Sequence, residues 1–258
     1  MKPDYKNWMP RGMVLSFLCA ALALCAAAIA CRAILGAGNI PGIVLSVLAV
    51  VMLCVTLWSF MLYRAFDYNG KRQMSKQIIE GIAAYVTLPQ NSVCLDVGCG
   101  SGALAIAVAK RNKTSKIVGI DRWGKEYASF SKTLCEQNAK AECIKNASFQ
   151  RGDALHLPFA DASFDAVVSN YVYHNIPSGD RQEILMETLR VLKKGGRFAL
   201  HDIFSKAKYG DMQAFVRRLR ALGYQQVDLI DTTNGKWISQ AEATFMGLSG
   251  SALLVGIK

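Results

Sequence analysis

Two uncharged apolar segments near the start of the sequence most constrain how this chain can fold. Residues 13–31 and 43–62 hold no Asp, Glu, Lys or Arg. A helix rises about 1.5 Å per residue, so roughly 20 apolar residues cross the hydrocarbon core of a bilayer. Residues 32–42 join the two segments and contain Gly36, Gly38, Pro41 and Gly42, which suit a tight reversal. The sequence therefore predicts a two-helix transmembrane hairpin within residues 1–64.

Basic residues lie on the outer sides of the two apolar segments. They are Lys2, Lys6 and Arg11 before the first segment, and Arg64, Lys71, Arg72 and Lys76 after the second. The connection between the segments holds only Arg32. Because positively charged loops stay in the cytoplasm, we expect a multi-pass protein with two spans and with both termini cytoplasmic.

Other interpretations of the apolar segments stay open. A basic start followed by an apolar stretch also begins a cleaved signal peptide, and a buried helical hairpin of a soluble protein has the same composition. Small residues in the first segment, among them Ala20, Ala23 and Ala27, let two membrane helices approach closely. The same residues would also support a homodimer through the hairpin.

The charge and the cysteines narrow the range of partners. The net charge is +11, of which +4 falls in residues 1–64 and +7 in the remainder. A basic domain is attracted to an anionic cytoplasmic leaflet, although a plain soluble surface explains the charge equally well. Arg217, Arg218 and Arg220 present the same choice between water and lipid headgroups. No nucleic-acid-binding motif is present, and the eight cysteines have no metal-ligand spacing, so we expect neither nucleic acid nor a metal.

Beyond residue 64 the sequence divides into a connector and an α/β domain. Residues 65–91 form a basic connector with a leading helix over residues 73–86. From residue 92 to 258, apolar strands alternate with helical patterns. We expect strands at residues 92–97, 116–120, 148–151, 164–168, 197–203, 226–231 and 251–258, and helices at residues 103–110, 125–139, 181–192 and 211–222. This alternation predicts a mostly parallel sheet with helices on both faces.

The most informative motif is the sequence LDVGCGSG at residues 95–102. It follows a strand and opens a helix, the place where open α/β sheets bind ligands. Gly98, Gly100 and Gly102 let the backbone turn tightly and approach a ligand without a Cβ clash. Asp96 places a carboxylate beside the loop, which suits a ligand with an ammonium group and a sulfonium charge. The alternative role for Asp96 is to cap the helix that follows.

Two more carboxylates follow the next two strands. Asp121 can accept hydrogen bonds from both hydroxyls of a ribose, and Asp153 lies where an adenine amino group can be met. Arg122 and Trp123 either flank the adenine or lie exposed in a loop. Gly98, Gly100 and Ala103 also fit a dinucleotide fingerprint, so a nicotinamide-dependent oxidoreductase is a competing class. Asp96 argues against that class, because its charge would repel a pyrophosphate.

Together these residues resemble the class I S-adenosylmethionine-dependent methyltransferases, over residues 73–258. Residues 95–102 resemble the first motif of that family, residues 118–121 its ribose-binding position and residues 164–170 its fourth-strand motif. Further matches are the adenine-contacting motif at residues 152–154, the spacer at residues 157–159 and the turn at residues 189–196. The resemblance implies a Rossmann-like seven-stranded sheet whose last two strands are antiparallel. It also implies S-adenosylmethionine as cofactor, held by Asp96, Gly98, Cys99, Gly100, Gly102, Asp121, Arg122, Gly152, Asp153, Ala154 and Asn170.

The catalytic group is expected in residues 170–175 (NYVYHN), which follow the fourth strand. His174 is the first candidate for a general base, because imidazole titrates near neutral pH. Tyr171 and Tyr173 are candidates to line the acceptor pocket. The alternative is that this segment only caps the next helix. His201 and Asp202 end the fifth strand at the same edge, where either could contact the acceptor.

The sequence therefore predicts a membrane-anchored methyltransferase that acts on a small, lipophilic or membrane-delivered acceptor. Residues 153–164 (DALHLPFADASF) resemble the branch that includes quinone-biosynthesis enzymes. A quinone precursor, a phospholipid headgroup amine or a hydrophobic xenobiotic would each fit. The alternative is a non-catalytic membrane scaffold that retains a cofactor pocket.

Overall fold

The computed structural model describes residues 2–124, 129–177 and 180–258 of the chain. These residues form two compact units, which are described separately. The first unit is residues 6–75, and the second is residues 76–258 together with the N-terminal residues 2–5.

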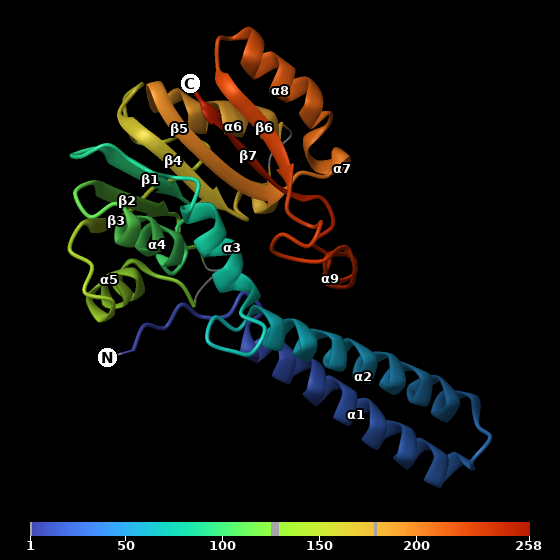
Figure 1. The fold of residues 1–258 in the computed structure, drawn as a ribbon. Coiled ribbons are helices and arrows are strands. Elements are labelled where there is room, and N and C mark those ends of the chain that lie inside the picture. The colour runs from blue at the N-terminus through green and yellow to red at the C-terminus, as the bar shows by residue number, and fades with distance from the viewer. Residues whose placement is uncertain (1, 125–128, 178–179) are drawn as a thin grey trace. The chain divides into compact units, whose positions relative to one another are not determined.

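The first unit is a helical hairpin made of α1 (Arg11–Leu35) and α2 (Ile40–Phe66) (Figure 1). Both helices extend beyond the predicted segments at each end. Asn39 caps α2, since its Oδ1 accepts a hydrogen bond from the Gly42 N–H at 2.6 Å. Both helices are long and apolar enough to cross a membrane, and only 11% of the most apolar stretch of each is buried.

The residues that pack α1 against α2 differ from the predicted ones. Ala20, Ala23 and Ala27 are exposed, whereas Ala21 and Ala28 are buried. Ala21 and Ala28 are seven residues apart and therefore lie on one stripe of the helix. Small residues do line the contact, as expected, but on a stripe one position further along.

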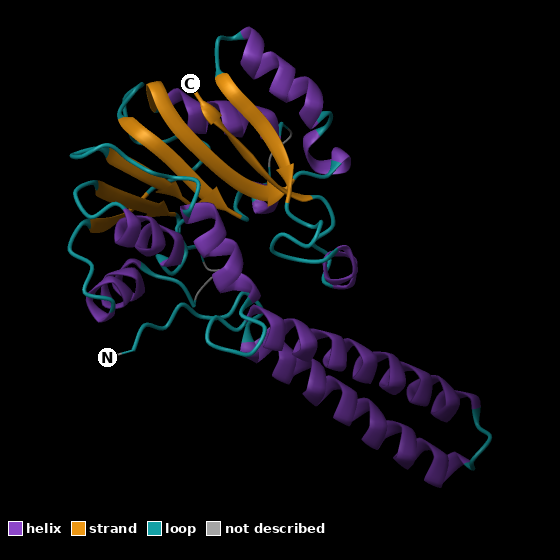
Figure 2. Ribbon diagram, in the orientation of Figure 1, coloured by secondary structure: helices purple, strands orange, loops and turns teal. Residues whose placement is uncertain are grey.

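The second unit is built around a seven-stranded sheet with helices on both faces (Figure 2). Its helices are α3 (Met74–Ala83, which begins at the end of the first unit), α4 (Ala103–Arg111), α5 (Lys132–Ala141), α6 (Arg181–Arg190), α7 (Lys206–Tyr209), α8 (Met212–Ala221) and α9 (Gln240–Phe245), with a short 3₁₀ turn η2 (Tyr173–Asn175). Its strands are β1 (Val93–Val97), β2 (Lys116–Asp121), β3 (Ala147–Arg151), β4 (Phe164–Asn170), β5 (Leu192–Ile203), β6 (Gln225–Asp231) and β7 (Ser251–Ile257).

The strands follow the order β3-β2-β1-β4-β5-β7-β6. Strands β1 to β5 pair in parallel, and β7 runs antiparallel to both β5 and β6. This arrangement confirms the expected seven-stranded sheet with an antiparallel pair at one edge. Apolar side chains of α6 and α8, among them Leu185, Leu189, Phe215 and Leu219, are fully or almost fully buried in the main core with β4 and β5.

Two predicted boundaries differ most from the structure. The helix expected from residue 125 begins only at Lys132, because the Ser131 side chain caps it by accepting from the Leu134 N–H at 3.1 Å. Residues 125–128 of that prediction lie outside the described residues. The Gly195–Gly196 pair was expected to precede a strand, but it lies inside β5. The pairing of β5 with β4 shifts register there, and Gly195 has a φ of +79°, so the two glycines form a bulge.

Candidate active site

The carboxyl ends of β1, β2, β4 and β5 meet at one edge of the sheet. Val97 of β1 pairs with Ile120 of β2 and with Ser169 of β4, and Asn170 of β4 pairs with His201 of β5. The segments that leave these strands therefore lie next to one another. They carry most of the residues that the sequence predicted to bind cofactor or acceptor.

The glycine loop, residues 98–102, needs its glycines for conformation and for space. Gly98, Gly100 and Gly102 have φ values of +72°, +55° and +81°, a region that side chains with a Cβ disfavour. A Cβ on Gly98 would lie 2.3 Å from a methyl group of Val172. The loop therefore packs directly against the segment that follows β4.

Asp96 lies under this loop and is only 1% exposed. Its Oδ2 accepts a hydrogen bond from the Ala105 N–H in the first turn of α4, at 2.9 Å. Burial raises the pKa of Asp96 well above its usual range, and the nearby charge of Asp121 raises it further. The structure thus gives Asp96 the helix-binding role that the sequence left as an alternative. Its contact with the cofactor stays a prediction.

Asp121 ties the glycine loop to the end of β2. Its Oδ2 accepts from the Gly100 N–H at 2.9 Å, and its Oδ1 accepts from the Trp123 N–H at 2.7 Å. Each carboxylate oxygen has a second lone pair, so both can still accept from a ribose hydroxyl. The Trp123 indole N–H donates to the Gly100 carbonyl at 3.0 Å, which holds the ring against the loop.

A surface pocket of about 430 Å³ adjoins the ends of β2 and β3. It is lined by Arg122, Arg151, Gly152, Asp153, His156 and Pro158. Three of these residues, Arg122, Gly152 and Asp153, were predicted to bind the cofactor. Ala154 instead packs against the main core. His156 and Arg151 had no predicted role, and their place in the pocket follows from the turn after β3 rather than from any motif.

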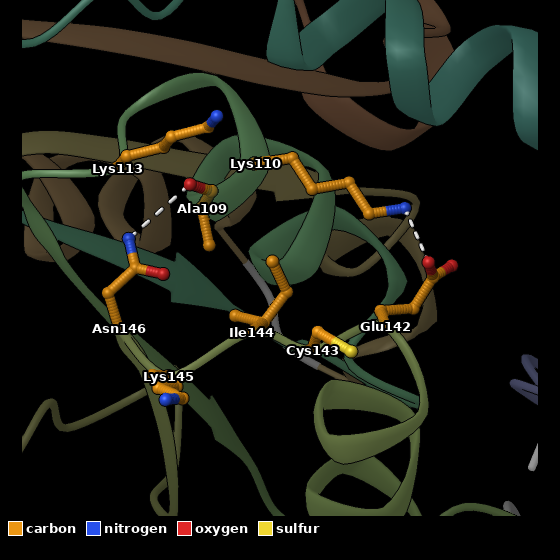
Figure 3. A pocket seen from close by; sticks show the side chains of 8 residues that line it. All are labelled: Ala109, Lys110, Lys113, Glu142, Cys143, Ile144, Lys145 and Asn146. Carbon is orange, nitrogen blue, oxygen red and sulfur yellow. Dashed lines mark hydrogen bonds and ion pairs between the residues drawn. The ribbon is translucent and has the colours of Figure 1, made fainter.

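A second hollow of about 400 Å³ lies away from this edge (Figure 3). Its lining residues follow α4 and α5, near the starts of β2 and β3, so it is opposite the ligand-binding ends of the strands. Lys110 pairs with Glu142 across it at 2.9 Å, and the Asn146 amide donates to the Ala109 carbonyl at 3.3 Å. These contacts connect the ends of the two helices, and we assign the hollow no part in cofactor binding.

Two residues that the sequence considered separately form a pair. Nδ1 of His174 lies 2.5 Å from Oδ1 of Asp202. The Asp202 carboxylate is fully buried and also accepts from the backbone N–H groups of Tyr173 (2.8 Å), His174 (3.2 Å) and Ile203 (2.7 Å). These donors stabilise its negative charge in the interior. The His174 side chain is 13% exposed, so the ring is oriented from behind and still reachable.

The two tyrosines beside His174 differ sharply. The Tyr171 ring lies 6.0 Å from the His174 ring and 4.6 Å from the His201 ring, and its hydroxyl is 2.8 Å from Oγ of Ser251. Tyr173 is fully buried, and its hydroxyl lies 3.1 Å from Oγ1 of Thr188. Tyr173 is therefore a core residue, which does not fit its predicted place in an acceptor pocket. The reason is that the turn η2 directs the Tyr173 side chain into the core and leaves Asn175 exposed.

His201 is an interior residue as well. Its ring nitrogens lie 2.8 Å from Oδ1 of Asn170 and 3.0 Å from Oγ1 of Thr232. Burial lowers the pKa of His201 to about 3, so the ring is neutral at physiological pH. His201 is 0% exposed and cannot meet an acceptor directly. Asn170 therefore supports this histidine, and its predicted cofactor contact stays a prediction.

Trp237 also belongs to this edge, and the sequence gave it no role. Its ring lies 5.2 Å from the His201 ring, and a Cβ on Gly81 of α3 would lie 2.3 Å from the indole. The segment between β6 and β7, which carries Trp237, matches no motif. Trp237 reaches the site because β7 runs antiparallel between β5 and β6, which places the segment before β7 at this edge of the sheet.

The fold and the site define a Rossmann-like domain that binds a nucleoside-containing cofactor. Residues 95–200 match the family model described as a methyltransferase domain. The 27-O-demethylrifamycin SV methyltransferase of Amycolatopsis mediterranei (strain S699) is 30% identical over 151 residues, which cover 58% of this chain and 53% of that protein. The 2-phytyl-1,4-beta-naphthoquinone methyltransferase of Arabidopsis thaliana is 38% identical over 114 residues, covering 44% of this chain and 42% of that protein.

Among solved structures, the cyclase SpnF has a TM-score of 0.55 at 20% identity, covering 74% of this chain and 85% of that chain. This similarity shows the fold alone. The chain spans about half the length of the curated relatives it matches. Residues 95–200 therefore resemble a methyltransferase domain, and the strand order is the Rossmann-like one expected of that class. The glycine loop and the Asp121 carboxylate suit S-adenosylmethionine, the cofactor that this resemblance implies.

Proposed function

We propose that this protein transfers a methyl group from S-adenosylmethionine to a hydroxyl group of a small, lipophilic acceptor, with His174 as general base. The observation that carries the proposal is the His174–Asp202 pair, which lies where β4 and β5 end. A buried carboxylate behind a reachable imidazole is the arrangement expected of a positioned base. The glycine loop packs on Val172, two residues before His174, so the base lies close to the cofactor loop.

The cofactor supplies an activated methyl group, and the protein has to align the acceptor and remove one proton. Nε2 of His174 would take the hydroxyl proton as the acceptor oxygen receives the methyl group that the cofactor supplies. Nδ1–H of His174 donates to Asp202, which stabilises the positive charge that the ring acquires. Burial raises the pKa of Tyr171 well above its usual range, so its hydroxyl stays protonated and serves as a hydrogen-bonding group.

Two features favour a flat, apolar acceptor. The half-buried Tyr171 ring lies at the site edge, and an aromatic layer supports it from behind, since the buried His201 ring lies 4.6 Å from Tyr171 and 5.2 Å from the Trp237 ring. Several relatives are named for naphthoquinone acceptors. The apolar hairpin of residues 11–66 would hold the enzyme at a bilayer, where such acceptors dissolve.

The test is label transfer with the full chain in membranes. Membranes that contain the protein are incubated with S-adenosylmethionine carrying a radiolabelled methyl group, and the lipid, protein and water-soluble fractions are counted. We expect label in small molecules of the lipid extract, and labelling about 10²–10⁴-fold slower when His174→Ala replaces the wild type. A protein that binds S-adenosylhomocysteine but labels no fraction would instead be a scaffold that retains the pocket.

The membrane part of the proposal has a separate test. Reporter fusions after residue 258 and within residues 36–39 should report the cytoplasm and the opposite side, respectively. The positive-inside distribution of Lys and Arg supports this topology. A non-cytoplasmic position of residue 258 would contradict the topology, and it would also separate the domain from cytoplasmic S-adenosylmethionine.

A further inference from the structure

Helix α5 carries a buried amide that joins two distant parts of the chain. Asn138 is only 2% exposed. Its Oδ1 accepts from the Asp4 N–H at 2.7 Å, and its Nδ2 donates to the Asp4 carbonyl at 3.0 Å. The same Nδ2 donates to the carbonyl of Ser101, also at 3.0 Å. Ser101 lies in the glycine loop, so a single side chain connects the N-terminal residues to the cofactor site.

The N-terminal residues 2–5, here called the strap, are fixed to α5 at a second point. The Tyr5 hydroxyl donates to Oε1 of Glu142 at 3.0 Å, and Tyr5 is only 4% exposed. The other carboxylate oxygen of Glu142 pairs with Lys110 of α4 at 2.9 Å (Figure 3). The strap therefore contacts Asn138 in the last turns of α5 and Glu142 directly after the helix.

If the strap leaves α5, the buried Asn138 amide loses its hydrogen bonds to Asp4. Its amide oxygen and one of its N–H groups are satisfied by the backbone of Asp4, in the manner of a strand pair. A buried polar group that loses its partner destabilises the folded state. Without the strap, the amide would turn toward water, and its remaining hydrogen bond to Ser101 would weaken. The Ser101 carbonyl lies between Gly100 and Gly102, whose positive φ values define the loop.

We propose that the strap positions the cofactor loop, with Asn138 as the positioning residue that acts through Ser101. Docking of residues 2–5 completes the hydrogen bonds of Asn138 and holds residues 100–102 in the form that binds S-adenosylmethionine. The inference rests on the proposed use of this loop for the cofactor. It also makes cofactor affinity depend on a segment that directly precedes the apolar hairpin in the sequence.

The test is the affinity of the full-length protein in detergent for S-adenosylhomocysteine, measured by titration calorimetry. The variants are a chain without residues 2–5, Asn138→Ala, and the two changes combined. Loss of a buried hydrogen bond predicts roughly tenfold weaker binding for each single variant. Because both changes act through the same contact, the combined variant should lose little more than either one. Gln137→Ala, at the neighbouring exposed position on α5, is the matched control and should bind as the wild type does.

The outcomes distinguish a failure of the strap proposal from a failure of the proposed function. Absence of binding by a folded wild type would contradict the proposed function. Wild-type binding with unchanged affinity in the chain without residues 2–5, or fully additive losses in the combined variant, would overturn the strap. If Asn138→Ala does not fold, hydrogen exchange of residues 98–102 gives the answer. Exchange there should be faster without the strap, and equal rates would reject the proposal.

Discussion

Substitutions of His174 and Asp202 should lower the methyl-transfer rate more than substitutions elsewhere in the site. His174→Ala removes the base, and Asp202→Asn removes the charge that orients the ring and stabilises its protonated form. General-base catalysis contributes about 10²–10⁴-fold, so we expect kcat to fall by that range in either variant. Affinity for S-adenosylhomocysteine should stay within about twofold, because neither side chain belongs to the cofactor loop. Initial rates with the labelled cofactor, together with calorimetry, check both expectations.

Retention of kcat in His174→Ala would show that the acceptor needs no proton removed. The acceptor atom would then be one that is already nucleophilic, such as a thiolate. The chemistry of the acceptor, rather than the fold, would have to be revised.

The buried His201 should make the free energy of unfolding depend on pH. Its pKa is about 3 in the folded protein, against about 6.5 for a free histidine. Between these values the unfolded chain binds a proton that the folded chain excludes, so stability falls as the pH drops from about 6.5 toward 3. The limiting slope is about 1.4 kcal/mol per pH unit. Urea unfolding from pH 4.5 to 6.5 should show a shallower slope for His201→Gln than for the wild type. Equal slopes would mean that His201 is protonated inside the fold.

Sequence patterns located the residues of the site better than they located the contacts. Asp121, Asp153 and His174 were predicted from their places after strands, since the ends of parallel strands share one edge. The pairing of His174 with Asp202 was not predicted, because the turn η2 has no periodicity that fixes where a ring points. Tyr173 was misplaced for the same reason. Trp237 and Asn138 gave no pattern at all, and only the tertiary fold brings Trp237 to His201 and Asn138 to the glycine loop.

At the scale of elements, charged residues introduced into the hairpin should weaken its insertion into a membrane. Leu22 and Leu53 lie near the middles of α1 and α2 and are 57% and 41% exposed. A lysine at the centre of a membrane helix costs about 2.5–3.5 kcal/mol on insertion scales. The double variant Leu22→Lys, Leu53→Lys should therefore become extractable by alkaline carbonate, whereas the wild type stays in the membrane pellet.

The matched control for the hairpin is Leu222→Lys, an equally large change at a residue of the other unit that is also 57% exposed. It should leave the protein in the pellet. Extraction of the wild type itself would argue against membrane spans and favour a peripheral attachment.

The sequence predicted the existence of elements more reliably than their ends. The predicted helices and strands appear in the expected order because apolar periodicity reports which face is buried, whereas the short helices α7 and α9 were not predicted. Their ends depend on single capping contacts, as at Ser131, which starts α5 seven residues later than expected. The glycines at 195 and 196 were taken as an interruption, whereas the sheet accommodates them as a bulge in β5. A glycine pair can end a strand or form a bulge within it, and here the pairing of β5 with β4 on both sides of the glycines makes it a bulge.

At the scale of the whole molecule, ligand binding should raise the stability of the fold. A ligand at 100 times its Kd stabilises the native state by about 2.7 kcal/mol. For a domain of this size, that corresponds to a rise in Tm of about 5–10 °C. S-adenosylhomocysteine should produce this rise in the full chain in detergent, and NADH should not. A shift with NADH alone would favour the oxidoreductase class.

The two-unit organisation was only partly visible in the sequence. Composition separates an apolar hairpin from an α/β domain, since apolar runs are local and easily counted. The grouping of residues 2–5 with residues 76–258 was not expected. Those residues have an ordinary polar composition, and their hydrogen bonds to Asn138 and Glu142 show where they belong.

The position of β7 also sets an order of events during synthesis. This strand lies between β5 and β6 although it comes last of the seven in sequence, so the sheet is incomplete until Ile257 has left the ribosome. The hairpin ends at Phe66 and is translated long before. The proposed anchor would therefore reach a membrane while the domain behind it is still unfolded. The strap has to wait as well, because its partner Asn138 is made after both apolar helices.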